Sequence, residues 1–375
     1  MARRVAQHPA AGRAVVVRQP IQPDSIGPDL WVDGDTVLFL SGCMWRSCGG
    51  GQRTVALARA FHRRGWRVLY YNPVEAGGQW AGGPLVLNPE ALGRIEPLLW
   101  EAKPGLVICG LQAYWGISER FQKRGWKVCY DIMDDWRAFA RVGEADYYRE
   151  PLERDLLAKA DILTCSTPSL QTYPHNGRVP PVIPNAGPSV PVPKCPRPAD
   201  LVVGEQGTAL YLGYLVGKWF DWGLLERTAR DLPNVAFNVV GDPKHHLAKA
   251  KNIHLLGERP YPVAMQYVAH CDVGLVPFRY AKLCAAVDPI KLYDYIAGGC
   301  RVVASGVMTA LEGREWCTLA PTGAKTLAPE VEQAIAAGRV PRRDAARWLK
   351  ANSWDARARQ FEALWRETAT DADAQ

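Results

Sequence analysis

Short runs of apolar and β-branched residues alternate with helical patterns along most of this chain. Runs of this kind are typical of strands buried on both faces, and successive parallel strands need a crossover segment, usually a helix. The alternation therefore predicts an α/β fold built on parallel sheets. In the first half the expected strands are 37–40, 68–71, 106–109, 128–131 and 162–165.

A proline-rich segment interrupts this alternation. Residues 180–198, PPVIPNAGPSVPVPKCPRP, contain eight prolines, which neither a central strand nor a helix interior tolerates. The alternation then resumes, and a chain of 375 residues is long enough for two domains with separate cores. In the second half the expected strands are 209–212, 235–240, 253–256, 273–276 and 301–304.

We divide the chain into five parts on this basis. They are a partly flexible N-terminal extension (1–30), a first Rossmann-like domain (31–187), a proline-rich linker (188–200), a second Rossmann-like domain (201–345) and a C-terminal crossover helix and tail (346–375). The last part carries Trp354, Phe361 and Trp365 among arginines and alanines, so we expect its helix to dock an apolar face on the protein.

The composition excludes several classes of protein. With 48% hydrophobic and 22% charged residues the chain is typical of soluble globular proteins, and no apolar run approaches the roughly 20 residues that span a bilayer. The ten cysteines include no CxxC pair, which indicates neither a zinc site nor a disulfide framework and fits a cytoplasmic location. The net charge of +7 favours an anionic partner, and nucleotide, phospholipid surface, nucleic acid and acidic glycan all stay open.

Residues 288–305, DPIKLYDYIAGGCRVVAS, have the pattern of a helix that starts at an anion-binding site. Pro289 fits the first helical position, and Gly298-Gly299 ends the helix before a buried strand. Lys291 and Asp294 then lie near the helix start, where free backbone N–H groups favour a negative ligand. A phosphate near Lys291 and a sugar hydroxyl near Asp294 suit this geometry; the alternative is a helix start with a purely structural role.

Three carboxylates follow the fourth expected strand of the first half. In the sequence YDIMDDW, Asp131, Asp134 and Asp135 lie at or just beyond the strand tip, and one of them could act as a general base on an acceptor hydroxyl. The alternative is that Asp134 or Asp135 caps the next helix and that Asp131 pairs with an arginine. A metal would need oxygen ligands such as these, but nothing else in the sequence indicates one, so we predict no metal.

The loop after the first strand is rich in glycine. Gly49, Gly50 and Gly51 allow close approach of the backbone to a ligand, although their spacing matches neither the dinucleotide fingerprint nor the P-loop. Open α/β folds bind ligands at this edge of the sheet. We therefore interpret the segment as a candidate acceptor or active-site loop.

The corresponding loop of the second domain combines glycine with a cation. Gly213 and Lys218 follow its first strand and form a candidate diphosphate cradle; the alternative is that Lys218 is a solvated loop residue. Glu258 follows another strand at the same expected edge of the sheet, where it could face a base or ribose.

Several segments of the chain together resemble the GT-B glycosyltransferases. The resemblance is closest to the bacterial teichuronic-acid glycosyltransferases and looser to the xanthan glucuronosyltransferase. The matching segments are YDIMDDWRAF, DILTCSTPSL, VIPNAG, LYLGYLVGKWFDWGLL, CDVGLVPF, AAVDPIKLYDYIAGGCRVVAS and the terminal helix that begins with SW. The resemblance implies two Rossmann-like domains facing across a cleft, with the terminal helix docked on the first.

The resemblance also implies where the substrates bind. The second domain would hold a nucleotide sugar, for instance a UDP-sugar, and the acceptor would enter from the first. Asp294 would bind the ribose, and Lys291 with the Pro289-Ile290 backbone would meet the diphosphate. The implied donor-binding residues are Gly213, Lys218, Glu258, Phe278, Pro289, Ile290, Lys291 and Asp294. Asp134 stands four residues after Tyr130, as the base does in the glucuronosyltransferase.

One position departs from the family pattern. Many GT-B enzymes carry a second acid eight residues before the ribose acid, but Ala286 stands there. This departure leaves the donor sugar and the retaining or inverting outcome open, although a base at Asp134 favours inversion.

Three functions follow from these observations. The first is a cytoplasmic glycosyltransferase of polysaccharide biosynthesis that uses no metal and acts on an acceptor glycan or lipid-linked sugar. Its basic clusters 59–67 and 123–127 would then contact the inner membrane peripherally, or alternatively cover the core with Trp66 and Trp126. The second is DNA modification, with a hydroxymethylated base as acceptor. The third is a nucleotide-sugar-binding module without activity.

Overall fold

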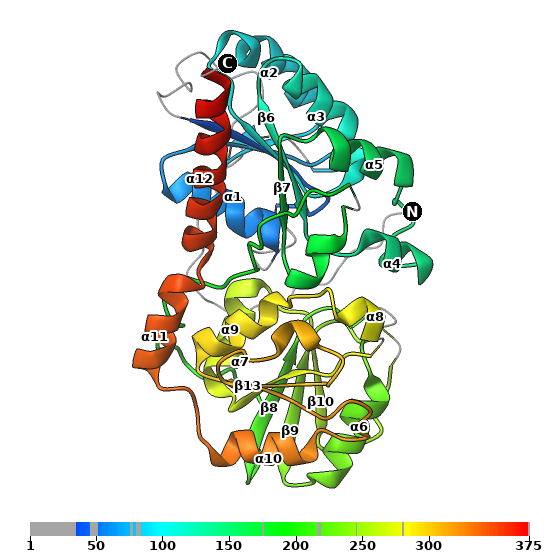
Figure 1. The fold of residues 1–375 in the computed structure, drawn as a ribbon. Helices are drawn as coiled ribbons and strands as arrows, with labels where there is room; N and C mark the ends of the chain where they lie inside the picture. Colours follow the sequence, from blue (N-terminus) through cyan, green and yellow to red (C-terminus); the bar gives the residue numbers. More distant parts are fainter. Residues whose placement is uncertain are drawn as a thin grey trace, which may run out of the picture.

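The computed structural model describes residues 35–45, 52–75, 78–79, 84–174, 176–215, 219–244, 246–279 and 281–373. The N-terminal extension, the Gly49, Gly50 and Gly51 loop and Lys218 therefore lie outside the described residues. The described chain forms two α/β domains, one above the other in Figure 1.

The first domain is built on a seven-stranded sheet in the order β3-β4-β2-β1-β5-β6-β7. All neighbours pair in parallel except β3 and β4. The strands are β1 (Thr36–Leu40), β2 (Arg67–Tyr71), β3 (Gly78–Gln79), β4 (Leu85–Leu87), β5 (Leu106–Cys109), β6 (Lys127–Ile132) and β7 (Ile162–Cys165). The helices are α1 (Arg53–Arg63), α2 (Pro89–Glu101), α3 (Trp115–Gln122), α4 (Trp136–Arg141) and α5 (Glu150–Lys159), with short 3-10 helices η3 (Gln112–Tyr114) and η4 (Pro168–Thr172).

The second domain has a parallel six-stranded sheet in the order β10-β9-β8-β11-β12-β13. Its strands are β8 (Gly207–Leu212), β9 (Val235–Val240), β10 (Ile253–Gly257), β11 (Val273–Val276), β12 (Arg301–Ala304) and β13 (Cys317–Leu319). Its helices are α6 (Trp222–Asp231), α7 (Tyr261–His270), α8 (Ala281–Cys284), α9 (Ile290–Gly298), η5 (Thr309–Leu311) and α10 (Ala328–Ala336). The strand order reverses between β8 and β11, which is where open α/β folds bind ligands.

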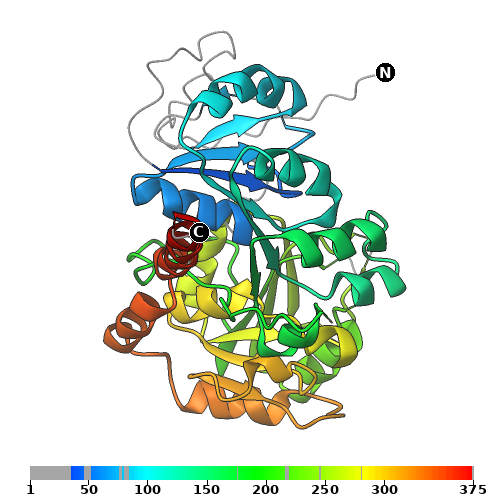
Figure 2. The same ribbon diagram turned by 45° about the horizontal axis from the view of Figure 1, so that its top comes forward.

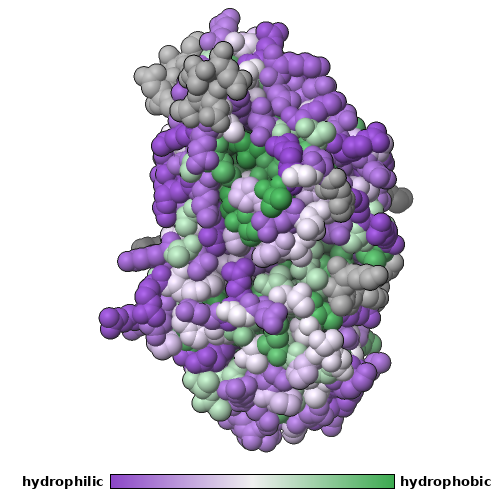
Figure 3. Space-filling model, in the orientation of Figure 1, coloured by the Kyte–Doolittle hydropathy of each residue, from purple (hydrophilic) through white to green (hydrophobic). Residues whose placement is uncertain are grey.

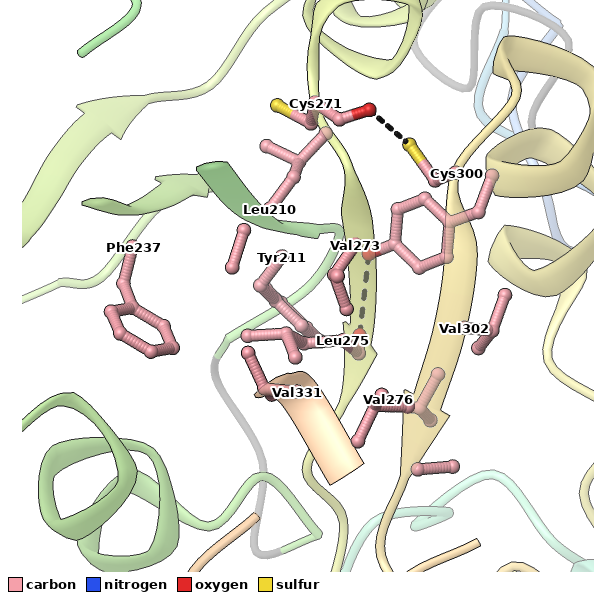
Figure 4. Close-up of a cluster of buried hydrophobic side chains, with 14 of the residues drawn as sticks. Leu210, Tyr211, Phe237, Cys271, Val273, Leu275, Val276, Cys300, Val302 and Val331 are labelled. Atoms are coloured by element: carbon pink, nitrogen blue, oxygen red, sulfur yellow. Dashed lines mark hydrogen bonds between the residues drawn. The ribbon is translucent and has the colours of Figure 1, made fainter. Parts of the chain in front are cut away.

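Both sheets are covered on both faces, as the apolar strand runs predicted. On β1, Val37 and Phe39 pack with α1, whereas Leu38 and Leu40 pack with α2 and α3 on the opposite face. In the second domain the core lies around β8, β11 and β12. Figure 4 shows part of it, with Leu210, Val273 and Val302 from these three strands and Val331 from α10.

The end of the chain returns to the first domain, which confirms the predicted docking of the terminal helix. After α11 (Arg342–Ala351), helix α12 (Trp354–Asp373) runs beside α1 in both ribbon views (Figures 1 and 2). Arg63, the last residue of α1, pairs with Asp355 of α12 at 2.8 Å, and Arg64, the C-cap of α1, pairs with Glu362 of α12 at 2.6 Å. Trp365 of α12 packs edge-on against Trp66, with ring centroids 5.0 Å apart.

These contacts bear on the two basic clusters. Two arginines of the 59–67 cluster hold α12, and both Trp66 and Trp126 are buried, so the clusters cover the core. Contact of either cluster with a membrane stays a prediction. The surface in Figure 3 is mostly hydrophilic, with an apolar area beside α12 on the first domain and smaller apolar areas on the second domain. Among the described helices, none combines the length and apolarity needed to cross a bilayer.

Candidate functional site

Helix α9 begins where the sequence placed it, with a shift of one residue. Pro289 is its N-cap rather than its first helical residue. At the other end Gly299 has a φ of 90°, and the N–H of Cys300 donates to the Tyr295 carbonyl oxygen at 2.8 Å, which completes a Schellman turn. The predicted Gly-Gly stop is therefore confirmed.

Lys291 lies in the first turn of α9 against residues from β8 and the loop after β11. Its Nζ donates to the Tyr211 hydroxyl at 2.9 Å and lies 4.8 Å from the centre of the Phe278 ring. Burial lowers the pKa of Lys291 to about 7, although the nearby Asp294 acts in the opposite direction. A cation held in apolar surroundings gains most from an anionic ligand, because the ligand replaces lost hydration.

Gly213 closes the other side of Lys291. It follows β8 with a φ of 136°, and a Cβ atom at this position would lie 3.0 Å from Lys291 Nζ. Glycine is needed here because other residues rarely adopt this φ and because a side chain would crowd Lys291 Nζ. The structure thus brings together three predicted donor-site residues, Gly213, Phe278 and Lys291, and adds Tyr211, which sequence reasoning missed.

Asp294 lies one turn further along α9 and is buried. Its Oδ1 accepts a hydrogen bond from the Tyr261 hydroxyl at 2.7 Å, whereas Oδ2 has no hydrogen-bond partner among the described residues. Burial raises the pKa of Asp294 to about 7, and Tyr261 and Lys291 oppose this shift. The free oxygen is an acceptor available to a ligand hydroxyl.

The loops after β8 and β11 run side by side at this edge of the sheet. Arg279 N–H donates to the Trp219 carbonyl oxygen at 2.7 Å, and Phe220 pairs with Phe278 as a single β-bridge. Glu258 lies farther away, since it follows β10, two strands from β8 in the sheet. Its side chain is exposed and makes no hydrogen bond with any described residue.

The three acids at the end of β6, Asp131, Asp134 and Asp135, have different surroundings. Asp131 is fully buried: Arg53 Nε and Nη2 donate to its two oxygens at 2.6 and 2.9 Å, and the Thr164 hydroxyl donates at 2.8 Å. Asp135 is the N-cap of α4 and accepts the Ala138 N–H at 2.9 Å. For these two acids the structure shows the pairing and capping that the sequence left as alternatives.

Asp134 differs from its neighbours because its carboxylate accepts no hydrogen bond from the described residues. Burial raises its pKa to about 7; Arg53 opposes the shift, while Asp135 and Asp131 add to it. A carboxylate without a partner and with a pKa near neutrality has the properties of a general base. Within the described part of the chain, no three His, Cys, Asp or Glu side chains come together as a metal site.

A buried polar network joins this region to α9. Arg53 Nη1 donates to Asn185 Oδ1 at 3.1 Å, and the Asn185 N–H donates to Asp288 Oδ2 at 2.8 Å. The Tyr293 hydroxyl of α9 donates to the same oxygen at 2.9 Å. Through Arg53 the network reaches Asp131 at the end of β6. Sequence reasoning missed Arg53 and Asn185, although VIPNAG and DPIK were both among the matched segments.

No protein-family model and no curated protein sequence matches this chain. Its structure is similar to several solved structures over nearly their whole length. α,α-Trehalose 6-phosphate synthase from Burkholderia multivorans has 12% identity and a TM-score of 0.59, covering 91% of this chain and 100% of its own. Anabaena Alr3699/HepE, solved with UDP-glucose, has 16% identity and a TM-score of 0.56, covering 91% and 100%.

Starch synthase IV from Arabidopsis thaliana, whose catalytic domain was solved with ADP and acarbose, has 12% identity and a TM-score of 0.58, covering 90% and 99%. These neighbours are GT-B glycosyltransferases. The chain therefore has the GT-B fold that the sequence predicted. At such identities the likeness shows the fold alone.

Proposed function

We propose that this protein is a glycosyltransferase that moves a sugar from a nucleoside-diphosphate sugar to an acceptor hydroxyl. The observation that carries the proposal is the pair Lys291 and Asp294 on the first turns of α9, at the point where the strand order reverses. A diphosphate followed by a ribose matches a cation, free backbone N–H groups and an acid with one oxygen to which no described residue donates.

Each side chain of this site has a role in donor binding. Lys291 and the α9 N-terminus would bind the diphosphate, and Asp294 Oδ2 would accept a ribose hydroxyl. Gly213 leaves room for the diphosphate beside Lys291, and Phe278 closes the apolar side. UDP is our first choice of nucleotide, since the HepE structure contains UDP-glucose.

Asp134 would remove the proton from the acceptor hydroxyl. As that oxygen bonds to the anomeric carbon, the bond from this carbon to the diphosphate breaks, and the electron pair leaves with the diphosphate. Lys291 and the α9 dipole stabilise the leaving group, so we propose that no metal is required. If the acceptor oxygen attacks from the face opposite the diphosphate, the anomeric configuration is inverted.

Ala286 fits this scheme. Many GT-B enzymes place an acid there, whereas here the Ala286 carbonyl oxygen accepts from the Thr167 hydroxyl of the first domain and its methyl group is buried. The position serves a contact between domains. The resemblance to teichuronic-acid glycosyltransferases favours a surface-polysaccharide precursor as the acceptor.

Thermal unfolding with a panel of nucleotide sugars tests the donor site. A ligand that binds only the folded state raises the melting temperature by mass action. We expect UDP-sugars to raise it by several degrees in the native protein and much less in Lys291→Ala. If no nucleotide sugar raises it, the proposed function is wrong. Binding without transfer or hydrolysis after an acceptor screen would instead favour a binding module.

A further inference from the structure

A cavity of about 280 Å³ lies at the junction of the two domains. Its walls come from α4 and η4 of the first domain and from the connection between α8 and α9 of the second. The Ser169 hydroxyl donates to the Ala285 carbonyl oxygen at 3.0 Å, so the wall is continuous across the two domains. This volume is close to the lower end of small-molecule sites.

Two arginines of α4 line this cavity. Arg137 and Arg141 are four residues apart and therefore lie on one face of the helix. Arg137 is fixed in place: its guanidinium lies 3.9 Å from the centre of the Tyr173 ring, and its Nε lies 3.7 Å from Glu153 Oε2. Arg141 is exposed and has no hydrogen-bond or ion-pair partner among the described residues.

The charges around the cavity favour an anion. Asp135 is the acid among the lining residues, and one of its oxygens is committed to the N-cap of α4. Arg137 is paired with Glu153 and donates to the Tyr173 carbonyl oxygen, so Arg141 is the lining cation whose charge no described residue balances. Guanidinium groups bind carboxylates and phosphates with paired, charge-assisted hydrogen bonds, which a neutral sugar ring cannot supply.

We propose that this cavity is an acceptor subsite that binds an oxyanion of the acceptor, either the carboxylate of an acidic sugar or a phosphate group. The inference rests on the proposed function, because Asp134, the proposed base, immediately precedes Asp135 on the cavity wall. The donor diphosphate has its own site at Lys291. The cavity therefore selects the acceptor and leaves donor binding unchanged.

Calorimetric titration of the whole protein, saturated with UDP, tests this inference. D-glucuronate serves as the carboxylate probe, pyrophosphate as the phosphate probe and glucose as the neutral control. We expect one of the two anions to bind and glucose not to. The stronger anion identifies the source of the oxyanion. If neither anion binds, the inference is wrong.

Three variants test whether the anion binds in this cavity. Arg141→Ala should weaken binding of the anion about tenfold, since it removes a charge-assisted hydrogen bond. Arg343→Ala, at an exposed arginine of α11, is the matched control and should leave binding unchanged. Asp135→Asn keeps the helix cap and removes the carboxylate charge, so it should strengthen binding. Equal affinities in Arg141→Ala and the native protein would overturn the inference.

UDP binding is measured first and separates the two proposals. If UDP does not bind, the proposed donor site is wrong. The anion titration is then repeated in Lys291→Ala to show whether the cavity binds an anion independently of Lys291. If UDP binds but anion binding does not depend on Arg141, the acceptor-subsite inference is wrong and the proposed function is unaffected.

Discussion

The backbone N–H of Asn185 donates to Asp288 Oδ2 at 2.8 Å and so joins the segment that leaves the first domain to the loop that begins α9. The Asn185 side chain accepts from Arg53, which in turn holds Asp131. The tip of β6 and the start of α9 are therefore connected by buried polar groups. This connection fixes the proposed base region relative to the proposed donor site.

Replacing Asn185 by Ala should loosen this connection. Arg53 Nη1 would lose its partner in a buried environment, which costs about 1–3 kcal/mol of the free energy of unfolding. Urea denaturation measures the stability. Asn176→Ala is the control, because the Asn176 side chain is exposed although it also makes hydrogen bonds, donating to the Leu157 carbonyl oxygen and accepting from the Arg178 N–H. Equal stability of the two variants would contradict a role for Asn185 between the domains.

Asp131→Asn should be more damaging to the fold than any change at its acidic neighbours. The substitution leaves the Arg53 guanidinium buried without its counter-charge, and breaking such a pair costs about 3–5 kcal/mol. Asp135→Asn preserves the N-cap and should change stability by less than about 0.5 kcal/mol. Thermal unfolding of both variants measures the difference, and a native-like Asp131→Asn would show that the ion pair is not structural.

Binding of UDP-glucose should weaken as the pH rises through 7. The pKa of Lys291 is lowered to about 7, so the empty site loses the positive charge of Lys291 above that pH. The pKa of Asp294 is raised to about 7, so Asp294 becomes negatively charged over the same pH range. The loss of the Lys291 charge disfavours the diphosphate, whereas ionised Asp294 still accepts the ribose hydroxyl. Affinity should fall up to tenfold per pH unit between pH 7 and 9.

Calorimetry at several pH values measures this dependence, and binding near pH 7 should take up protons. Lys291→Met should bind weakly at every pH with a smaller slope. An affinity that is constant from pH 6 to 9 in the native protein would show that Lys291 does not bind the diphosphate.

Gly213→Ala should weaken donor binding about tenfold, because the new methyl group would displace Lys291 Nζ. Gly313→Ala separates this contact from backbone strain: Gly313 also has a positive φ, 70°, but no atom lies within 4 Å of its Cβ position. Both variants should lose some stability. If their affinities for UDP-glucose are the same, the contact with Lys291 has no role in binding.

The sequence was sufficient for elements that carry a strong local pattern. The strand 273–276 and the Gly-Gly end of α9 were predicted because buried β-branched runs and positive-φ glycines are local signals. β4 and β13 were missed because each has only three residues. Strand pairing and helix packing, not local pattern, fix such short strands.

The side chains of the candidate site were predictable only in part, because their partners are remote in sequence. Lys291 meets Tyr211 across 80 residues, and Arg53 meets Asn185 across 132. The acids 131, 134 and 135 looked alike in sequence. Their roles separate only once Arg53 and α4 are in place, which leaves Asp134 as the acid whose carboxylate has no partner in the described part of the chain.

The most direct test of the account is the transfer rate of Asp134→Asn, measured with the donor and acceptor that the native protein accepts. In the native protein the rate should rise with pH through about 7, because burial raises the pKa of Asp134 to that value and the base must be ionised. The variant should keep donor affinity and lose about 10²–10⁴-fold in rate, with no such pH dependence. An unchanged rate in Asp134→Asn would contradict the proposed mechanism.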